Sequence, residues 1–149
     1  MVKLWDVDAF TFLKDHTPLF AGVDEKHLET LAGASALQAC KKGATVLFQG
    51  ITVDAVHVVA MGSLSVQIKV PNKGLTTVAE LSAGEVFGET SIFEMGTAGA
   101  TIKAAQDDTY VIVIPQDAFR NLLAEDPAFV ERVKALIASR KAPPKAPQG

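Results

Sequence analysis

The chain has few of the residues that build disulfide frameworks or metal centres. It contains one cysteine, Cys40, among 149 residues, so an internal disulfide and a zinc site made of cysteines are excluded. Its three histidines, His16, His27 and His57, stand apart, without the close spacing of metal-ligating pairs. We therefore expect neither a metal nor a tightly held cofactor.

A long apolar run and an excess of positive charge are also absent. The longest stretch without Asp, Glu, Lys or Arg spans residues 55–68, too short to cross a bilayer as a helix. Asp6 and Asp8 stand where a signal peptide needs its apolar core. A net charge of −3 argues against general affinity for nucleic acid or anionic membranes, because that affinity needs clustered positive charge. We expect a cytoplasmic chain with no membrane or nucleic-acid partner.

The composition is that of one folded domain. Hydrophobic residues make up 48% and charged residues 21% of the chain, values typical of globular proteins, and the length suits a single core. Residues 141–149 hold three of the seven prolines and are expected to form a disordered tail. The prediction is one domain over residues 1–140.

Both ends of this domain have helical patterns. Residues 5–35 carry apolar residues at helical spacing, interrupted by Pro18, and a second helix is expected from Asp24, as N-cap, to Gly33. Residues 116–140 return to helix. Asp126 followed by Pro127 is a strong start signal, since it combines a capping carboxylate with proline at the first helical position.

The last helix, residues 126–140, has an apolar stripe with two interpretations. The stripe is formed by Val130, Val133, Leu136 and Ile137. It is wide enough to be a contact surface for a protein partner or a second copy of the chain. The alternative is that it packs back on the chain's own barrel, as a lid.

Between the helices the pattern changes to that of β-strands. The cleanest alternation is at residues 63–70, where Leu64, Val66, Ile68 and Val70 face one way and the polar residues between them face the other. A second alternation is expected over residues 56–61. Several short strands with glycine turns indicate an antiparallel sandwich or barrel over residues 37–115.

No motif requires catalysis. The Gly-x-Ser-x-Gly, Walker and Rossmann glycine patterns are all missing. Lys41 and Lys42 follow Cys40 and would lower its pKa, but the favoured interpretation is a half-buried strand cysteine. We do not expect an enzyme.

The informative segment is residues 84–104. Gly84 and Gly88 lead into a stretch, residues 89–94, that fits a single helical turn, and a loop of small residues, 96–100, leads into a strand. Backbone N–H groups at a helix start, beside small side chains, are typical of an anion or sugar-phosphate cradle. From these residues alone, a plain connection between strands is the favoured interpretation.

The order of the residues resembles a known family. Phe87-Gly-Glu89 and Ala100-Thr-Ile-Lys-Ala104 are similar to the phosphate-binding cassette of the cyclic nucleotide-binding domain family. This family includes kinase regulatory subunits, cyclic nucleotide-gated channels and catabolite-activator-type regulators. Further similar segments are Pro18-Leu-Phe20, Gln49-Gly50, Asp54, Gly62-Ser63 and Asp117-Ala-Phe119. The resemblance covers roughly residues 17–138 and implies a mainly β fold with flanking helices, an antiparallel, jelly-roll-like β-roll of about eight strands.

The resemblance also implies roles for the cassette residues. Glu89 would hydrogen-bond the ribose 2′-hydroxyl, and the N–H groups near Gly88 and Thr90 would surround the sugar-phosphate. Ser91 would donate to a phosphate oxygen, and Thr101 would lie near the base. The candidate ligand-binding residues are Phe87, Gly88, Glu89, Thr90, Ser91, Ala98, Gly99, Ala100 and Thr101.

One departure from the family is decisive. The family's Pro-Arg-x-Ala-Thr falls on Thr97-Ala-Gly-Ala-Thr101, so Ala98 replaces the phosphate-clamping arginine, and the chain's arginines all lie in the C-terminal helical region. Losing charge-assisted hydrogen bonds worth about 1.5–3 kcal/mol each should weaken binding by about one to three orders of magnitude. We expect a regulatory or interaction module that binds cyclic AMP or cyclic GMP weakly or not at all. The alternatives are a functional cyclic nucleotide sensor that signals to a partner, and a binder of another small anion.

Overall fold

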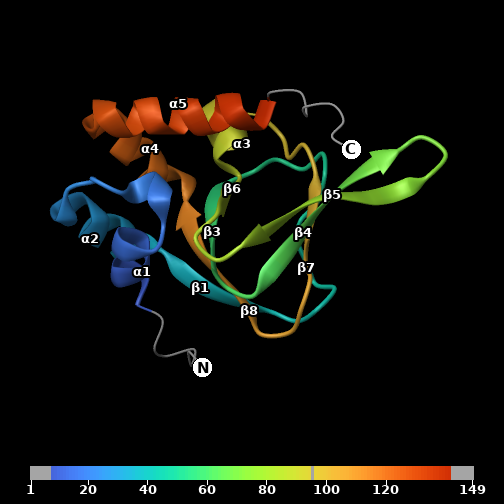
Figure 1. Cartoon of the computed structure of the whole chain (residues 1–149). Coiled ribbons are helices and arrows are strands. Elements are labelled where there is room, and N and C mark those ends of the chain that lie inside the picture. Colours follow the sequence, from blue (N-terminus) through green and yellow to red (C-terminus); the bar gives the residue numbers. More distant parts are fainter. Residues whose placement is uncertain (1–7, 95, 142–149) are drawn as a thin grey trace.

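The computed structural model describes residues 8–94 and 96–141, and two four-stranded antiparallel sheets form its centre (Figure 1). The strand order is β1-β8-β3-β6 in one sheet and β2-β7-β4-β5 in the other. The strands are β1 (Ala36–Cys40), β2 (Thr45–Leu47), β3 (Ala55–Met61), β4 (Ser63–Val70), β5 (Gly74–Ser82), β6 (Val86–Phe87), β7 (Thr101–Ala104) and β8 (Thr109–Pro115). The predicted β-roll of about eight strands is confirmed.

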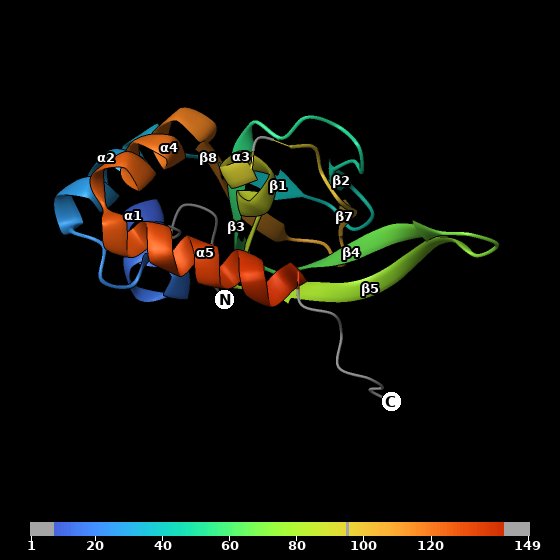
Figure 2. The ribbon, with the colours of Figure 1, turned by 90° about the horizontal axis from the view of Figure 1, so that it is seen from above.

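The helices gather at one end of this β-roll (Figures 1 and 2). They are α1 (Ala9–Asp15), the 3-10 helix η2 (Pro18–Phe20), α2 (Glu25–Ala34), α3 (Glu89–Glu94), α4 (Gln116–Glu125) and α5 (Pro127–Lys141). Within residues 5–35, the described helix begins only at Ala9, because Asp8 caps it by accepting a hydrogen bond from the Phe10 N–H. The tail expected at 141–149 lies outside the described residues except for Lys141, which ends α5.

Strand β3 corrects the expected alternation over residues 56–61. Six consecutive residues, 55–60, are buried, so the even and odd positions do not differ in exposure. The reason is its central place: β3 pairs with β8 on one edge and β6 on the other, and it contacts α3 and α4. A strand covered on both faces reads as a continuous apolar run.

Helix α5 packs on its own chain. Asp126 Oδ1 accepts a hydrogen bond from the Phe129 N–H (3.0 Å), which confirms the predicted cap. The Phe129 ring stacks on Phe20 of η2 and meets Phe119 of α4 edge-on, with centroids 5.3 and 5.6 Å apart. Val133 and Ile137 of the stripe are buried. The stripe therefore packs within its own chain, but the main contacts of α5 are with η2, α3 and α4 rather than with the barrel on which the second interpretation placed it as a lid. Its most buried residues are not available as a partner surface.

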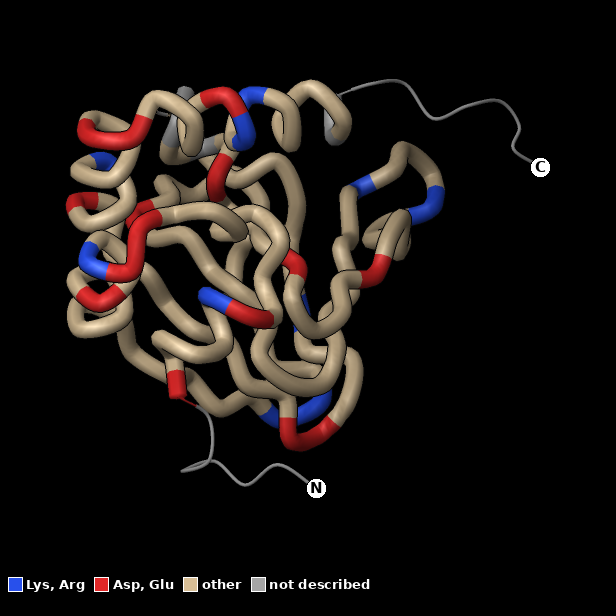
Figure 3. Tube along the Cα trace, turned by 60° about the vertical axis from the view of Figure 1, so that its left-hand side comes forward, with Lys and Arg blue, Asp and Glu red and all other residues tan. Residues whose placement is uncertain are grey.

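The β4–β5 hairpin extends beyond the rest of the β-roll (Figures 1 and 2). β4 pairs with β7 only from Leu64 to Gln67, whereas it pairs with β5 along its whole length. Figure 3 shows the Lys and Arg residues of the described chain spread over separate elements and interspersed with Asp and Glu.

Candidate functional site

A glycine turn fixes the start of α3 beside β3. Strand β6 pairs with β3 through Phe87 opposite His57, and Gly88 then turns the chain into α3 with φ +92°. A Cβ atom at Gly88 would lie 2.9 Å from the Ala55 carbonyl oxygen. Only glycine therefore combines this φ with so close an approach to β3, and Glu89 follows as the first residue of the helix.

The loop of small residues, 96–100, is fastened to the loop between β2 and β3. The Ala98 N–H donates to the Ile51 carbonyl and the Ala98 carbonyl accepts from the Gly50 N–H, both at 2.8 Å. Thr97 forms a β-bridge with Thr52. The backbone groups of Ala98 are thus used within the chain, and only its methyl group is left to meet a ligand.

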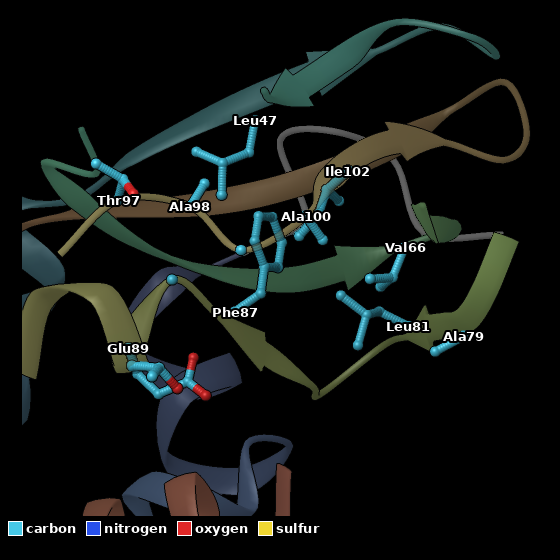
Figure 4. Close-up of a pocket in the computed structure, with 13 residues that line it drawn as sticks. Leu47, Val66, Ala79, Leu81, Phe87, Glu89, Thr97, Ala98, Ala100 and Ile102 are labelled. Carbon is cyan, nitrogen blue, oxygen red and sulfur yellow. The ribbon is translucent and has the colours of Figure 1, made fainter. Parts of the chain in front are cut away.

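A pocket of about 480 Å³ lies between this loop, the start of α3 and the second sheet (Figure 4). Seven of the nine predicted site residues line it: Phe87, Gly88, Glu89, Thr90, Ala98, Gly99 and Ala100. The fold therefore brings the two segments of the cassette, residues 87–90 and 98–100, to one cavity. The predicted helical turn at residues 89–94 is α3.

The other two predicted residues are not placed in this pocket. Thr101 is 8% exposed and does not belong to the lining. Its hydroxyl oxygen accepts a hydrogen bond from the Gln49 N–H (3.0 Å), so it holds the two loops together. Ser91 lies in α3, but its side chain falls outside what the structure describes.

Sequence reasoning missed six lining residues. Five of them come from the second sheet and form the far wall, namely Leu47, Val66, Ala79, Leu81 and Ile102, and the sixth is Thr97 of the 96–100 loop. The alternation at residues 63–70 put Val66 on the apolar face, which was a usable signal. No local pattern predicts the strand register, and it is this register that brings Val66 opposite Ala79 and Ile102.

The described lining of the pocket supplies no positive charge. None of the described lining residues is Lys, Arg or His, and Glu89 is fully buried. Arg120 and Arg132 are engaged elsewhere, because they donate to the carbonyls of Ile92 (2.9 Å) and Leu19 (3.1 Å). The side chain of Arg140 lies outside the described part of the chain.

Burial shifts the pKa values of two other titratable groups, His57 and Cys40. His57 is 7% exposed, and burial lowers its pKa to about 4 despite the nearby Asp54 carboxylate, which raises it. Cys40 lies in a strand as favoured, at the end of β1, and is buried rather than half-buried. Burial raises the pKa of its thiol, against the alternative that Lys41 and Lys42 lower it. Among residues 8–94 and 96–141, no group of His, Cys, Asp and Glu is placed to hold a metal ion.

None of the described helices is both long and apolar enough to cross a bilayer.

Known proteins share this sequence and this fold. The chain is 25% identical to the cyclic AMP receptor protein of Thermus thermophilus over 124 residues, which is 83% of the chain and 57% of that relative. It is 26% identical over 98 residues to a lysophospholipase of Chaetomium globosum, of which it spans 6%, against 66% of its own length. The chain thus spans at most about three fifths of either curated relative.

A solved structure extends the likeness in fold. The sensor domain of the transcriptional regulator DNR from Pseudomonas aeruginosa superimposes with a TM-score of 0.76 at 20% identity, covering 87% of each chain. Residues 37–126, more than half of the chain, match the profile of the cyclic nucleotide-binding domain. With the β-roll, the Phe87-Gly-Glu89 turn and the pocket it lines, this match shows that the chain belongs to the cyclic nucleotide-binding domain family.

Proposed function

We propose that this cyclic nucleotide-binding domain is a ligand-sensing regulatory module whose pocket lacks a phosphate clamp. The observation that carries the proposal is Ala98: the family resemblance aligns it with the clamping arginine, and it lines the pocket with 4% of its surface exposed. No lysine, arginine or histidine stands in for that arginine among the described lining residues. Cyclic nucleotides therefore bind weakly.

The expected weakness follows from the missing hydrogen bonds. A bidentate guanidinium–phosphate contact contributes about 1.5–3 kcal/mol for each charge-assisted hydrogen bond. Without it, a site of micromolar affinity falls to a Kd no tighter than roughly 10 μM. The same lack of a cation argues against another small anion as the ligand.

Helix α3 supplies a route from the pocket to the C-terminal helices. Its first residues, Glu89 and Thr90, line the pocket, and the helix contacts α5. Arg120 of α4 donates to the Ile92 carbonyl of α3. A ligand that shifts the start of α3 would therefore act on α4 and α5, through which the module would signal to a protein partner.

Isothermal titration calorimetry with cyclic AMP and cyclic GMP tests the proposal. We expect a Kd no tighter than roughly 10 μM for the natural chain and a gain of at least about tenfold for Ala98→Arg. Gly96→Arg is the matched control. It adds the same charge to the same loop at an exposed position whose Cβ would meet nothing within 4 Å. Sub-micromolar binding by the natural chain, or an equal gain in the control, would contradict the proposal.

A further inference from the structure

One row of apolar residues runs straight across the sheet that forms the far wall of the pocket. The register pairs Leu47 with Ile102, Ile102 with Val66, and Val66 with Ala79. Each residue comes from a different strand, in the order β2, β7, β4 and β5, and all four line the pocket. Directly paired residues place their side chains on the same face of a sheet, so the row is a continuous apolar strip.

An aromatic ring from the other sheet faces this strip. Phe87 is 2% exposed and lines the pocket from β6. In Figure 4 its ring points toward the side where Leu47, Ala98 and Ile102 lie. Leu81, two residues after Ala79 on β5, extends the same wall. The cavity is thus bounded by hydrocarbon on two sides.

The strip becomes more exposed toward one end. Leu47 and Ile102 are buried, Val66 is half-buried and Ala79 is exposed. One mouth of the pocket therefore lies at the base of the β4–β5 hairpin, where apolar surface faces water, and Thr97 and Gly99 are exposed on the side of the loop. Covering such surface is favourable in proportion to its area, whatever the charge of the ligand's other parts.

The residues around this strip offer an anion no positive charge. None of the described lining residues is Lys, Arg or His, and the N–H of Ala98 is donated to Ile51. A phosphate at this place would be desolvated without a cation, which is costly. We infer that the pocket takes an uncharged ligand with an aromatic or aliphatic body, an inference that rests on the proposed sensing function and names its ligand class.

A competition experiment on the intact chain tests the ligand class. Nile red, a neutral apolar dye, should bind saturably at one site per chain with a blue shift of its emission. 1-Naphthol should displace it at a concentration roughly tenfold or more below that needed of 1-naphthyl phosphate, because only the ester must bury its charge. Equal or better displacement by the ester would overturn the inference, as would a failure of Nile red to saturate.

A pair of variants locates the site. Ala79→Glu puts a carboxylate at the exposed end of the strip and should weaken Nile red binding by roughly tenfold. Thr77→Glu makes the same change two residues away on β5. The β-bulge between these positions puts Thr77 opposite Gln67, the neighbour of Val66, and so on the other face of the sheet, where it accepts a hydrogen bond from the Gln67 amide (3.3 Å). This control should change binding by less than about twofold. An equal loss in both variants, or none in Ala79→Glu, would contradict the assignment.

A parallel titration with cyclic AMP separates the two proposals. If cyclic AMP binds with sub-micromolar affinity and Nile red also binds saturably, the proposal that the missing clamp weakens cyclic nucleotide binding is refuted. The inference of an apolar, uncharged ligand is then unaffected. Weak cyclic AMP binding without Nile red binding would refute the ligand class alone.

Discussion

His57 and Phe87 stack face to face across the β3–β6 pair, with ring centroids 4.7 Å apart and planes 7° apart. The imidazole lies behind the aromatic wall of the pocket, and burial there lowers its pKa to about 4. At neutral pH it is therefore an uncharged ring that supports Phe87. Protonation would put a charge into this apolar layer, which links the stability of the pocket to pH.

Acid should destabilise the chain through His57. The unfolded histidine binds a proton near pH 6.5 and the folded one near pH 4, so unfolding takes up a proton between these values. The free energy of unfolding therefore falls as the pH is lowered through this window, by up to roughly 3 kcal/mol. Urea unfolding at pH 7.0, 5.5 and 4.5 measures the loss.

The variant His57→Phe isolates this contribution from that of the carboxylates. It keeps a ring against Phe87 but has no proton to bind, so its stability should fall less steeply over the same pH range. Parallel slopes for the variant and the natural chain would show that His57 does not carry the effect.

Gly88→Ala should cost more stability than the matched change Gly50→Ala. Both glycines have φ near +90°, so both variants incur the left-handed penalty of about 1–2 kcal/mol. At Gly88 the new methyl group also meets the Ala55 carbonyl oxygen at 2.9 Å, whereas at Gly50 it meets nothing within 4 Å. We expect an additional loss of about 1 kcal/mol or more at Gly88, measured by chemical denaturation. Equal losses would mean that β6 moves away freely.

Asp126→Ala should cost about 1 kcal/mol, since it removes the side chain that accepts from the Phe129 N–H. Asp24→Ala is the control at the start of α2, where the aspartate makes no capping hydrogen bond with its side chain. Its exposed ion pair with His27 should contribute only a few tenths of a kcal/mol. Thermal unfolding of the two variants gives the comparison, and a larger loss for Asp24 would contradict it.

Phe129→Ala should loosen α5 from the body of the domain. The ring is fully buried between Phe20 and Phe119, so its removal should cost about 3–5 kcal/mol. Val130→Ala, on the half-buried side of the same helix, should cost about 1 kcal/mol or less. Comparable losses in urea unfolding would mean that Phe129 is not the anchor.

Local patterns predicted where several elements lie. Residues 63–70 form β4 within the predicted bounds, and Gln116–Glu125 is α4, because the sequence period records the type of element. The exposure of β4 does not follow the expected alternation: of its apolar positions only Leu64 is buried, because β4 leaves β7 after Gln67. Asp126-Pro127 predicted a helix start from chemistry that is entirely local. The continuous burial of β3 was not predicted, because it depends on contacts with elements far away in the sequence.

The residues of the candidate site show the same difference between local motifs, which were predicted, and long-range pairing, which was not. Phe87, Gly88 and Glu89 were found because the turn from β6 into α3 is a local motif. Leu47 and Ala79 were not found, because they reach the pocket through pairing across four strands. Thr101 was expected near the base of a ligand, whereas in the fold it does not line the pocket and its hydroxyl oxygen accepts from the Gln49 N–H.

The β4–β5 hairpin extends beyond β7. The domain therefore has two parts whose backbone amides become exposed to solvent by different motions. Past Gln67 its amides are held only by the other arm of the hairpin, so they exchange with solvent deuterium through local separation of two strands. The amides of β3, buried between β8 and β6, exchange only when the whole domain unfolds. Val66 and Ala79 sit where these two regimes meet. This mouth of the pocket can therefore widen on the timescale of the hairpin while the β-roll behind it stays closed.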